Sequence, residues 1–197
     1  IGTHGMAHAL ETVIDAAKLL EAEEPGQHAI LMLGDGARKH ALQQKALDEG
    51  VSNVLFLDAV PKPDVPGFWS LLDLAVIHLK RDPAFREVIP SKLFEAMAMG
   101  VPVVLGLEGE AAEIVERHEI GSVIEPQNAR AMASAIKELA SDPQRRAEMR
   151  ANAGRASLGY ERKRLALNML EVLADAVARH QPRRRPSPAR RPWWARS

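Results

Sequence analysis

The stretch Glu87-Val-Ile-Pro-Ser-Lys-Leu-Phe-Glu-Ala-Met-Ala-Met-Gly-Val-Pro-Val-Val104 decides the fold that we expect for this chain. Pro90 disfavours helix for the residue before it, and Ser91 is a candidate N-cap. Residues 92–99 are good helix formers, and Gly100 suits the left-handed conformation that ends a helix. The β-branched run after Gly100 predicts a buried strand. The stretch is therefore predicted to be a loop, a helix, a turn and a strand.

The start of this predicted helix is a candidate anion site. The first N–H groups of a helix have no partner within it, and Lys92 adds a positive charge beside them. Helical side chains lean toward the N-terminus, so Glu95, one turn inside, leans toward the same place. Glu87 approaches from the preceding loop. A helix start that holds phosphate, next to two carboxylates that can accept sugar hydroxyls, predicts a nucleotide-sugar site.

The rest of the chain alternates apolar strands with helical segments. Strands are predicted at 28–33, 53–57, 74–79, 101–105 and 121–124, and helices near 9–20, 37–49, 67–72, 92–99, 110–118, 128–141, 143–154 and 160–178. This alternation predicts an α/β fold, a Rossmann-like doubly wound parallel sheet with helices on both faces. Ligands in such sheets bind beyond the carboxyl ends of the strands. The segments at those ends are Gly2–Gly5, Gly34–Gly36, Val60, His78–Arg81 and Ser91–Lys92, and we expect them to form one cleft.

Charge is distributed unevenly along the chain. Residues 182–197 hold six arginines and no acid, which leaves 20 basic and 26 acidic residues, a net charge of −6, for the remainder. A net negative charge on the remainder of the chain argues against a nucleic-acid-binding domain, because such domains are usually basic. We predict a domain over residues 1–180 and a disordered basic tail over residues 181–197, because the tail is rich in Arg and Pro and has no periodicity.

The first residues predict that part of the fold lies outside this chain. A strand should lead into the glycine turn at Gly2, and only Ile1 stands there. We expect the first strand of the sheet, together with an N-terminal acceptor-binding domain, to belong to a longer protein. Because that strand is central in this fold, its loss should expose strand edges and favour association or instability.

Composition limits the cellular setting. The chain has no cysteine, so disulfides and thiolate chemistry are excluded. We expect no signal peptide, and no apolar run approaches the ~18 residues of a membrane helix. We therefore expect a cytoplasmic protein with at most peripheral contact with the inner membrane.

Several glycines and histidines have competing interpretations. Gly34-Asp35-Gly36 lacks the third glycine of a dinucleotide fingerprint, and a strand-end Gly-x-Gly is also typical of a simple turn. His4 and His8 have a metal-ligand spacing but no third ligand nearby, so no metal site is predicted. His4 could instead donate to a phosphate or a sugar hydroxyl. His78 fits a core residue as well as a site residue.

Three cations, Lys80, Arg81 and Arg86, lie within seven residues near the predicted phosphate position. Each taken alone fits a solvated loop. Their grouping at strand ends favours a role beside the ligand, and Lys80 is the one that we carry forward as a donor-binding residue.

These residues resemble the C-terminal, donor-binding half of a GT-B glycosyltransferase, most like family 4 of the retaining enzymes. The resemblance covers about residues 1–178 and rests on Glu-x7-Glu, here Glu87 and Glu95, followed by Gly100-Val-Pro-Val-Val104. The sequence from Gly2 to Leu10, Gly-Thr-His-Gly-Met-Ala-His-Ala-Leu, is similar to the corresponding segment in the family branch that builds bacterial O-antigen and capsule. Annotated members of that branch include fucosamine-type transferases.

The resemblance implies a role for each matched residue. Glu87 would contact the donor sugar and Glu95 the ribose hydroxyls. The amides of Ser91, Lys92 and Leu93 would hold the diphosphate. Gly5 belongs to the donor turn, and Gly34, Asp35, Gly36 and Val60 would line the nucleobase. His4 and Glu87 are the catalytic candidates. Family members usually carry an Arg and a Lys near the first strand end, where this chain has Thr3-His4-Gly5, so Lys80 or Lys92 would supply the charge.

The function implied is the donor domain of a retaining glycosyltransferase. It would use a UDP-sugar, such as UDP-N-acetyl-L-fucosamine, and no metal cofactor. Its partner would be a glycan or polyprenyl-linked acceptor, bound through the missing domain, in lipopolysaccharide O-antigen synthesis. We expect this chain alone to bind nucleotide weakly and to transfer nothing. Two alternatives remain open, a nucleotide-sugar epimerase of the same fold and a non-catalytic interaction domain.

Overall fold

The structure is a computed structural model that describes residues 1–180. Residues 1–159 form one compact unit, and a second unit begins at Tyr160. The predicted disordered tail at 181–197 lies outside the described residues.

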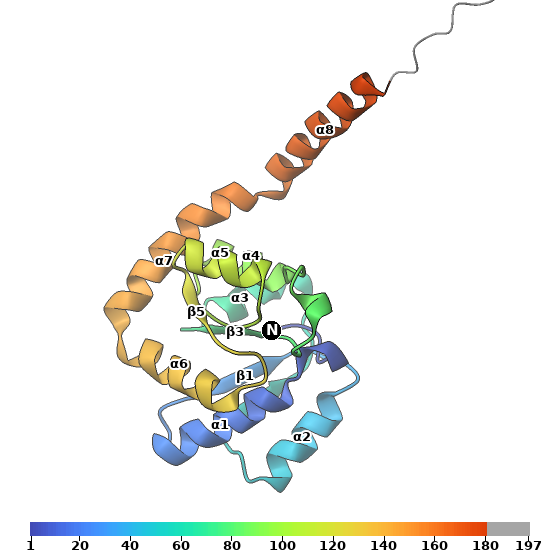
Figure 1. Cartoon of the computed structure of the whole chain (residues 1–197). Helices are drawn as coiled ribbons and strands as arrows, with labels where there is room; N and C mark the ends of the chain where they lie inside the picture. The colour runs from blue at the N-terminus through green and yellow to red at the C-terminus, as the bar shows by residue number, and fades with distance from the viewer. Residues whose placement is uncertain (181–197) are drawn as a thin grey trace, which may run out of the picture. The chain divides into compact units, whose positions relative to one another are not determined.

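The first unit alternates strands and helices in the order that the sequence predicts (Figure 1). Its strands are β1 (Ile30–Leu33), β2 (Val54–Leu57), β3 (Ala75–His78), β4 (Val103–Gly106) and β5 (Gly121–Val123). Its α-helices are α1 (Glu11–Glu23), α2 (Lys39–Asp48), α3 (Val65–Trp69), α4 (Ser91–Met99), α5 (Glu110–Arg117), α6 (Ala129–Ser141) and α7 (Pro143–Ser157). Short 3-10 helices are η1 (Met6–His8), η2 (Lys62–Asp64) and η3 (Pro83–Phe85).

All strand pairs are parallel, which confirms the predicted fold class, but the strands form two sheets. β1 pairs with β2, and β3, β4 and β5 pair in that order. A single continuous sheet was expected from the sequence. β1 and β3 are each hydrogen-bonded to a strand on one side only within the described residues.

Helix α1 packs between two parts of the core. Its residues Val13, Ala16 and Leu20 join side chains of β4, α6 and α7 in one buried cluster. Residues Ile14 and Ala17, on an adjacent face, join β1 and α2 in a second cluster. Helices α4 and α5 lie on the other side of the three-stranded sheet (Figure 1). Helices thus cover both faces, as the near-continuous apolar strands indicate.

The deciding stretch folds largely as predicted, with one correction. Gly100 has φ 64° and ψ 31° and ends α4 in the left-handed conformation. The prediction that Ser91 caps this helix is wrong: Pro90 occupies the N-cap position with an extended backbone, and no side chain caps the helix. Ser91 is the first helical residue, because the proline ring already fixes the extended entry.

A second correction concerns the proline-broken segment after β2. The helix expected near 67–72 begins at Val65 and ends at Trp69, and it follows directly on η2. Pro66 is accommodated because it lies in the first turn, where a missing N–H costs nothing.

The short 3-10 helix η4 (Leu158–Tyr160) spans the boundary between the units, and the second unit contains α8 (Arg162–Arg179). Its apolar side chains, Leu165, Leu167, Met169, Leu170, Val172, Leu173 and Val177, are exposed. No helix within residues 1–180 is both long and apolar enough to cross a membrane.

Candidate functional site

The glycine turn at the start of the chain pairs with the end of β1. The amide of Gly2 donates to the Leu33 carbonyl and that of His4 to the Asp35 carbonyl, each at 2.8 Å. The amide of Arg38 then donates to the His4 carbonyl at 3.0 Å. Backbone hydrogen bonds therefore join the turn at residues 2–4 to the Gly34-Asp35-Gly36 segment.

Gly34 and Gly36 are required by this close approach. A Cβ added to Gly34 would lie 1.8 Å from the Gly2 carbonyl oxygen, and one at Gly36 would lie 2.6 Å from the His4 carbonyl oxygen. Both glycines have positive φ values, 143° and 153°. Only glycine combines this conformation with such contact. The backbone contact therefore explains why glycine stands at both positions, independently of any contact with a nucleobase. Asp35 is exposed between them, and its carboxylate accepts from the Gly36 amide at 2.7 Å.

The first turn of α4 stands beside this glycine turn. Lys92 Nζ donates to both carboxylate oxygens of Glu95, at 2.9 and 2.7 Å. The Lys92 Cε atom lies 3.0 Å from the place where a Gly2 Cβ would be. The structure therefore brings the Lys92–Glu95 pair of α4 next to the glycine turn at Gly2, which is far from it in sequence.

The predicted diphosphate amides are not equivalent. The Leu93 amide donates to the Pro90 carbonyl at 2.9 Å. Of the three predicted donors, Ser91 and Lys92 are thus the two that a phosphate group could use. The Ser91 side chain is exposed, and that of Lys92 is partly exposed.

His4 is 4% exposed, and its ring atom Nδ1 is buried without a partner among the described residues. Burial, followed by the nearby Lys39 charge, lowers the pKa of His4, so its ring is neutral at pH 7. The sequence did not predict this burial. Gly5 is extended and leads into η1 beside it.

A buried lysine that the sequence analysis missed holds the ends of β1 and β2 together. Lys39 is 6% exposed, and its Nζ donates to the carbonyls of Gly34 at 3.0 Å and Leu57 at 3.2 Å. It also contacts the Asp58 carboxylate at 2.5 Å, and this bond holds the pKa of Asp58 below its usual value. The available signal was a lysine in the first turn of a helix that follows Gly-x-Gly.

His78 is a buried core residue with structural hydrogen bonds. Its Nε2 accepts from the Gln127 amide at 2.8 Å, so Nδ1 carries the proton and donates to the His8 carbonyl at 2.8 Å. Burial lowers the pKa of His78, which is 3% exposed. This neutral ring fastens η1 and the loop after β5 to the end of β3.

The remaining predicted residues lie in the surface loops at these strand ends. Arg81 and Arg86 are paired with Glu108, at 3.3 and 2.8 Å, and Arg81 also pairs with Glu125. The backbone of Lys80 donates to the Ala7 carbonyl at 2.8 Å, and its side chain is exposed. Glu87 is exposed in the loop before α4, and Val60 is partly exposed after β2. Within residues 1–180 no cluster of three or more His, Cys, Asp or Glu side chains could hold a metal ion.

Comparison with known families adds the decisive observation. Residues 6–156 match the family model described as "Glycosyl transferases group 1". This chain belongs to that family. Membership favours the glycosyltransferase interpretation over an epimerase or a non-catalytic domain.

This group 1 glycosyltransferase chain is similar in sequence to two characterised types of enzyme. It is 32% identical over 124 residues to the GDP-mannose-dependent alpha-(1-6)-phosphatidylinositol monomannoside mannosyltransferase of Mycolicibacterium smegmatis. It is 26% identical over 180 residues to the D-inositol 3-phosphate glycosyltransferase of Thermobispora bispora. The matches cover 61% and 87% of this chain but only 32% and 41% of the relatives. The chain thus matches less than half the length of each relative.

Two solved structures of other proteins share the fold. The C-terminal domain of LpcC from Francisella tularensis aligns with a TM-score of 0.65 at 21% identity, over 80% of this chain and 83% of that domain. HepE from Anabaena, in complex with UDP, aligns with a TM-score of 0.73 at 23% identity, over 88% of this chain and 48% of HepE. At these identities the likeness extends to the fold alone.

Proposed function

We propose that this chain is the donor-binding half of a retaining glycosyltransferase that uses a UDP-sugar. The observation that carries the proposal is the Lys92–Glu95 pair in the first turn of α4, next to the glycine turn at the end of β1. Ligands of open parallel sheets bind at this edge, and helix starts favour anions.

The pair retains the hydrogen-bonding capacity that a nucleotide needs. An ammonium has three donors, and Lys92 uses two of them on Glu95, which leaves one for a phosphate oxygen. Each oxygen of Glu95 keeps a lone pair for a ribose hydroxyl. One pair of side chains can therefore contact the diphosphate and the ribose at once.

The proposed chemistry depends on charge stabilisation. When the sugar leaves, negative charge develops on the β-phosphate, and the amides of Ser91 and Lys92 with the Lys92 ammonium would stabilise it. Glu87 would orient the sugar through its hydroxyls. Neither Glu87 nor Glu95 is assigned as a general base. Under this proposal no metal is needed, and EDTA should leave nucleotide affinity unchanged.

The sugar and the setting are also proposals. The name of one relative includes GDP-mannose dependence, and the structural neighbour HepE was solved with UDP. We propose UDP-N-acetyl-L-fucosamine as the donor, a glycan or polyprenyl-linked acceptor, and a cytoplasmic site with peripheral contact at the inner membrane during O-antigen synthesis. GDP binding tighter than UDP binding would correct the base and leave the donor site in place.

The test separates ribose contacts from phosphate contacts. UDP affinity should fall about 10-fold in Lys92→Met and about 10- to 100-fold in Glu95→Gln, because each loses a charge-assisted hydrogen bond. Replacing UDP by 2′-deoxy-UDP should weaken binding to the parent protein but add little to the Glu95→Gln loss. Lys18→Met, an exposed lysine paired with Glu49, is the matched control and should bind UDP like the parent. If the losses of affinity from 2′-deoxy-UDP and from Glu95→Gln were additive, Glu95 would not be the residue that contacts the ribose hydroxyl.

A further inference from the structure

The loop that joins β3 to α4 carries Glu87, the residue proposed above to orient the donor sugar. Two bonds beside Glu87 are local: the Arg86 amide donates to the Pro83 carbonyl and the Val88 amide to the Phe85 carbonyl, each at 3.2 Å. Such turns shape the loop but do not fix it against the sheet. The position of the exposed Glu87 carboxylate therefore depends on contacts between this loop and its neighbours.

The neighbouring loop between β4 and α5 holds the residue next to Glu87. The Arg86 carbonyl accepts a hydrogen bond from the Glu110 amide at 2.9 Å, the first N–H of α5, which has no partner within that helix. The Nε and Nη2 atoms of Arg86 donate to one carboxylate oxygen of Glu108, at 3.1 and 2.8 Å. Arg86 is thus bound through both its backbone and its side chain by residues 108–110.

Gly109 permits this close approach of the two loops. Its backbone has φ 80° and ψ −143°, and an added Cβ would lie 2.2 Å from the Arg86 carbonyl oxygen. Glycine adopts such a positive φ without strain, whereas other residues do not. The atom in the way belongs to the backbone, so no side-chain rotation relieves the clash. A larger residue at position 109 would therefore displace the backbone that carries Glu87.

Arg81 links the same carboxylate to the loop after β5. Its Nη2 lies 3.3 Å from the second oxygen of Glu108, and its Nη1 donates to Glu125 at 2.7 Å. The Arg81 amide donates to the side-chain oxygen of Gln127 at 2.9 Å. The hydrogen bond from Arg86 and then the charges of both arginines lower the pKa of Glu108, so this carboxylate is ionised at neutral pH. Ion pairs thus connect the loops that follow β3, β4 and β5.

These ion pairs are too exposed to contribute much to stability. The side chain of Glu108 is 33% exposed and that of Arg86 is 63% exposed, and ion pairs of this kind add little to the free energy of folding. Ligand recognition is far more sensitive to placement, because a shift of about 1 Å in a group that orients a substrate can cost orders of magnitude. The contribution of the pairs should therefore appear in binding of the sugar rather than in folding.

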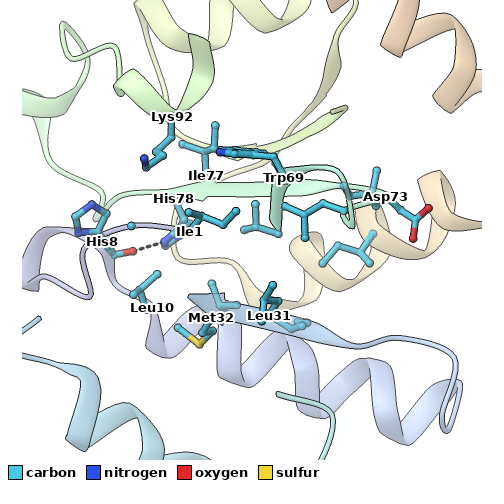
Figure 2. A pocket seen from close by; sticks show the side chains of 18 of the residues that line it. Ile1, His8, Leu10, Leu31, Met32, Trp69, Asp73, Ile77, His78 and Lys92 are labelled. Atoms are coloured by element: carbon cyan, nitrogen blue, oxygen red, sulfur yellow. Dashed lines mark hydrogen bonds between the residues drawn. The ribbon is translucent and has the colours of Figure 1, made fainter. Parts of the chain in front are cut away.

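The nucleotide contacts lie apart from this network. Lys92 lines the cavity of about 680 Å³ between β1 and β3, where Figure 2 shows it beside Ile1. Arg86 and Glu108 line a separate small depression and do not line that cavity. Changes at residues 108–110 should therefore leave contacts with the nucleotide in place.

We propose that Glu108 and Gly109 are positioning residues for Glu87. They hold the backbone and the guanidinium of Arg86, and so place the adjacent carboxylate against the donor sugar. This role rests on the function proposed above, in which Glu87 contacts the sugar and the first turn of α4 contacts the nucleotide. It predicts that recognition of the sugar and binding of UDP can be separated by substitutions in the loop between β4 and α5.

The readout is the Kd of UDP divided by the Kd of UDP-N-acetyl-L-fucosamine, measured by calorimetric titration of the full chain. Glu108→Gln should lower this ratio about 3-fold, because it removes the charge from an exposed ion pair. Gly109→Ala should lower it about 10-fold or more, because it moves the loop backbone. The Kd of UDP alone should stay within about 2-fold in both variants, since the nucleotide contacts are distant. Glu113→Gln, which breaks the exposed pair with Arg117 on α5, is the matched control and should leave both Kd values unchanged.

A double-mutant cycle tests whether Glu108 acts through Arg86. Arg86→Met should lower the ratio about as much as Glu108→Gln, and the double variant should lower it no further. Additive losses would overturn the proposal, and so would a Glu108→Gln ratio equal to that of the parent. Absence of UDP binding to the parent would contradict the donor site instead, whereas UDP binding with unaltered ratios would contradict only the positioning role.

Amide exchange in the free chain tests the loop contact without any ligand. The Glu110 amide reports its bond to the Arg86 carbonyl directly, and its exchange should quicken about 10-fold in Gly109→Ala. Gly154→Ala is the matched control, because an added Cβ meets no atom within 4 Å there, and exchange at Glu110 should not change. Unchanged exchange at Glu110 in Gly109→Ala would show that Gly109 does not hold the loop, and would overturn the proposal.

Discussion

The carboxyl ends of the two sheets are held by different chemistry. At the β1–β2 end, close backbone contact at Gly34 and the buried ammonium of Lys39 fix the loops. At the β3–β4–β5 end, the neutral ring of His78 joins η1 to the loop after β5. An imidazole can change its charge within the physiological pH range. The first end should therefore be the more sensitive to shape, whereas the bonds that His78 makes at the second end should depend on pH.

The largest effect is expected from Gly34→Ala. Its Cβ would lie 1.8 Å from the Gly2 carbonyl at a φ of 143°, so the glycine turn would have to move. We expect a loss of about 3–5 kcal/mol in the free energy of unfolding, from overpacking and backbone strain together. Chemical denaturation measures it.

Gly154→Ala is the control for that substitution. No atom lies within 4 Å of a Cβ added there, and Gly154 sits inside α7. We expect a gain of about 0.5–1 kcal/mol, because alanine favours helix. A Gly34→Ala protein as stable as its parent would show that the turn is not fixed by backbone contact.

Lys39→Met should have the next largest effect. Methionine keeps much of the volume but leaves the Gly34 carbonyl without the ammonium, while the Leu57 carbonyl keeps its bond from the Gly34 amide. We expect a loss of about 1–3 kcal/mol, the usual range for a buried acceptor that loses its donor. Lys45→Met, which removes a lysine paired with Asp15 and Glu49, is the matched comparison and should cost about 1 kcal/mol or less. Equal losses would mean that burial gives Lys39 no special role.

The smallest effect concerns pH and two buried histidines, His78 at the end of β3 and His4 in the glycine turn beside β1. Burial lowers the folded-state pKa of His78 and of His4, so the unfolded chain takes up protons first as pH falls below about 6.5. Stability should be fully present above that pH and should then fall by up to about 1.4 kcal/mol per pH unit for each histidine. Denaturation between pH 7.5 and 5.5 measures the slope, which His78→Asn should reduce.

His40→Asn, at an exposed histidine on α2, is the control and should leave that slope unchanged. A parent protein whose stability is flat from pH 7.5 to 5.5 would contradict the assignment of a neutral, buried His78.

The sequence predicted the elements well because their signals are local. Gly100 ends α4 through a conformation that glycine favours, and the apolar strands appear near their predicted residues. Ser91 was misassigned because Pro90 and Ser91 both suit a helix start, and only the backbone angles distinguish N-cap from first turn. Lys39 was missed because a lysine on a polar helix resembles any surface lysine until the fold buries it.

The candidate site was predictable in part. The meeting of Lys92 and Glu95 follows from helical spacing, and their approach to Gly2 follows from the edge of a parallel sheet. The engagement of the Leu93 amide by Pro90 depends on the local backbone path, which composition does not determine. The division into two sheets depends on pairing across long sequence separations, and the ligand roles of Glu87, Val60 and Lys80 remain predictions.

The central claim is that the start of α4 and the glycine turn bind a nucleotide diphosphate. The most direct measurement is calorimetric titration of the folded chain with UDP and with GDP, with Lys92→Met and Glu95→Gln in parallel. The account predicts heat of binding with UDP, a weaker response with GDP, and about 10-fold or greater loss of affinity in each variant. Absence of heat with both nucleotides, in protein whose amide exchange shows it to be folded, would contradict the claim.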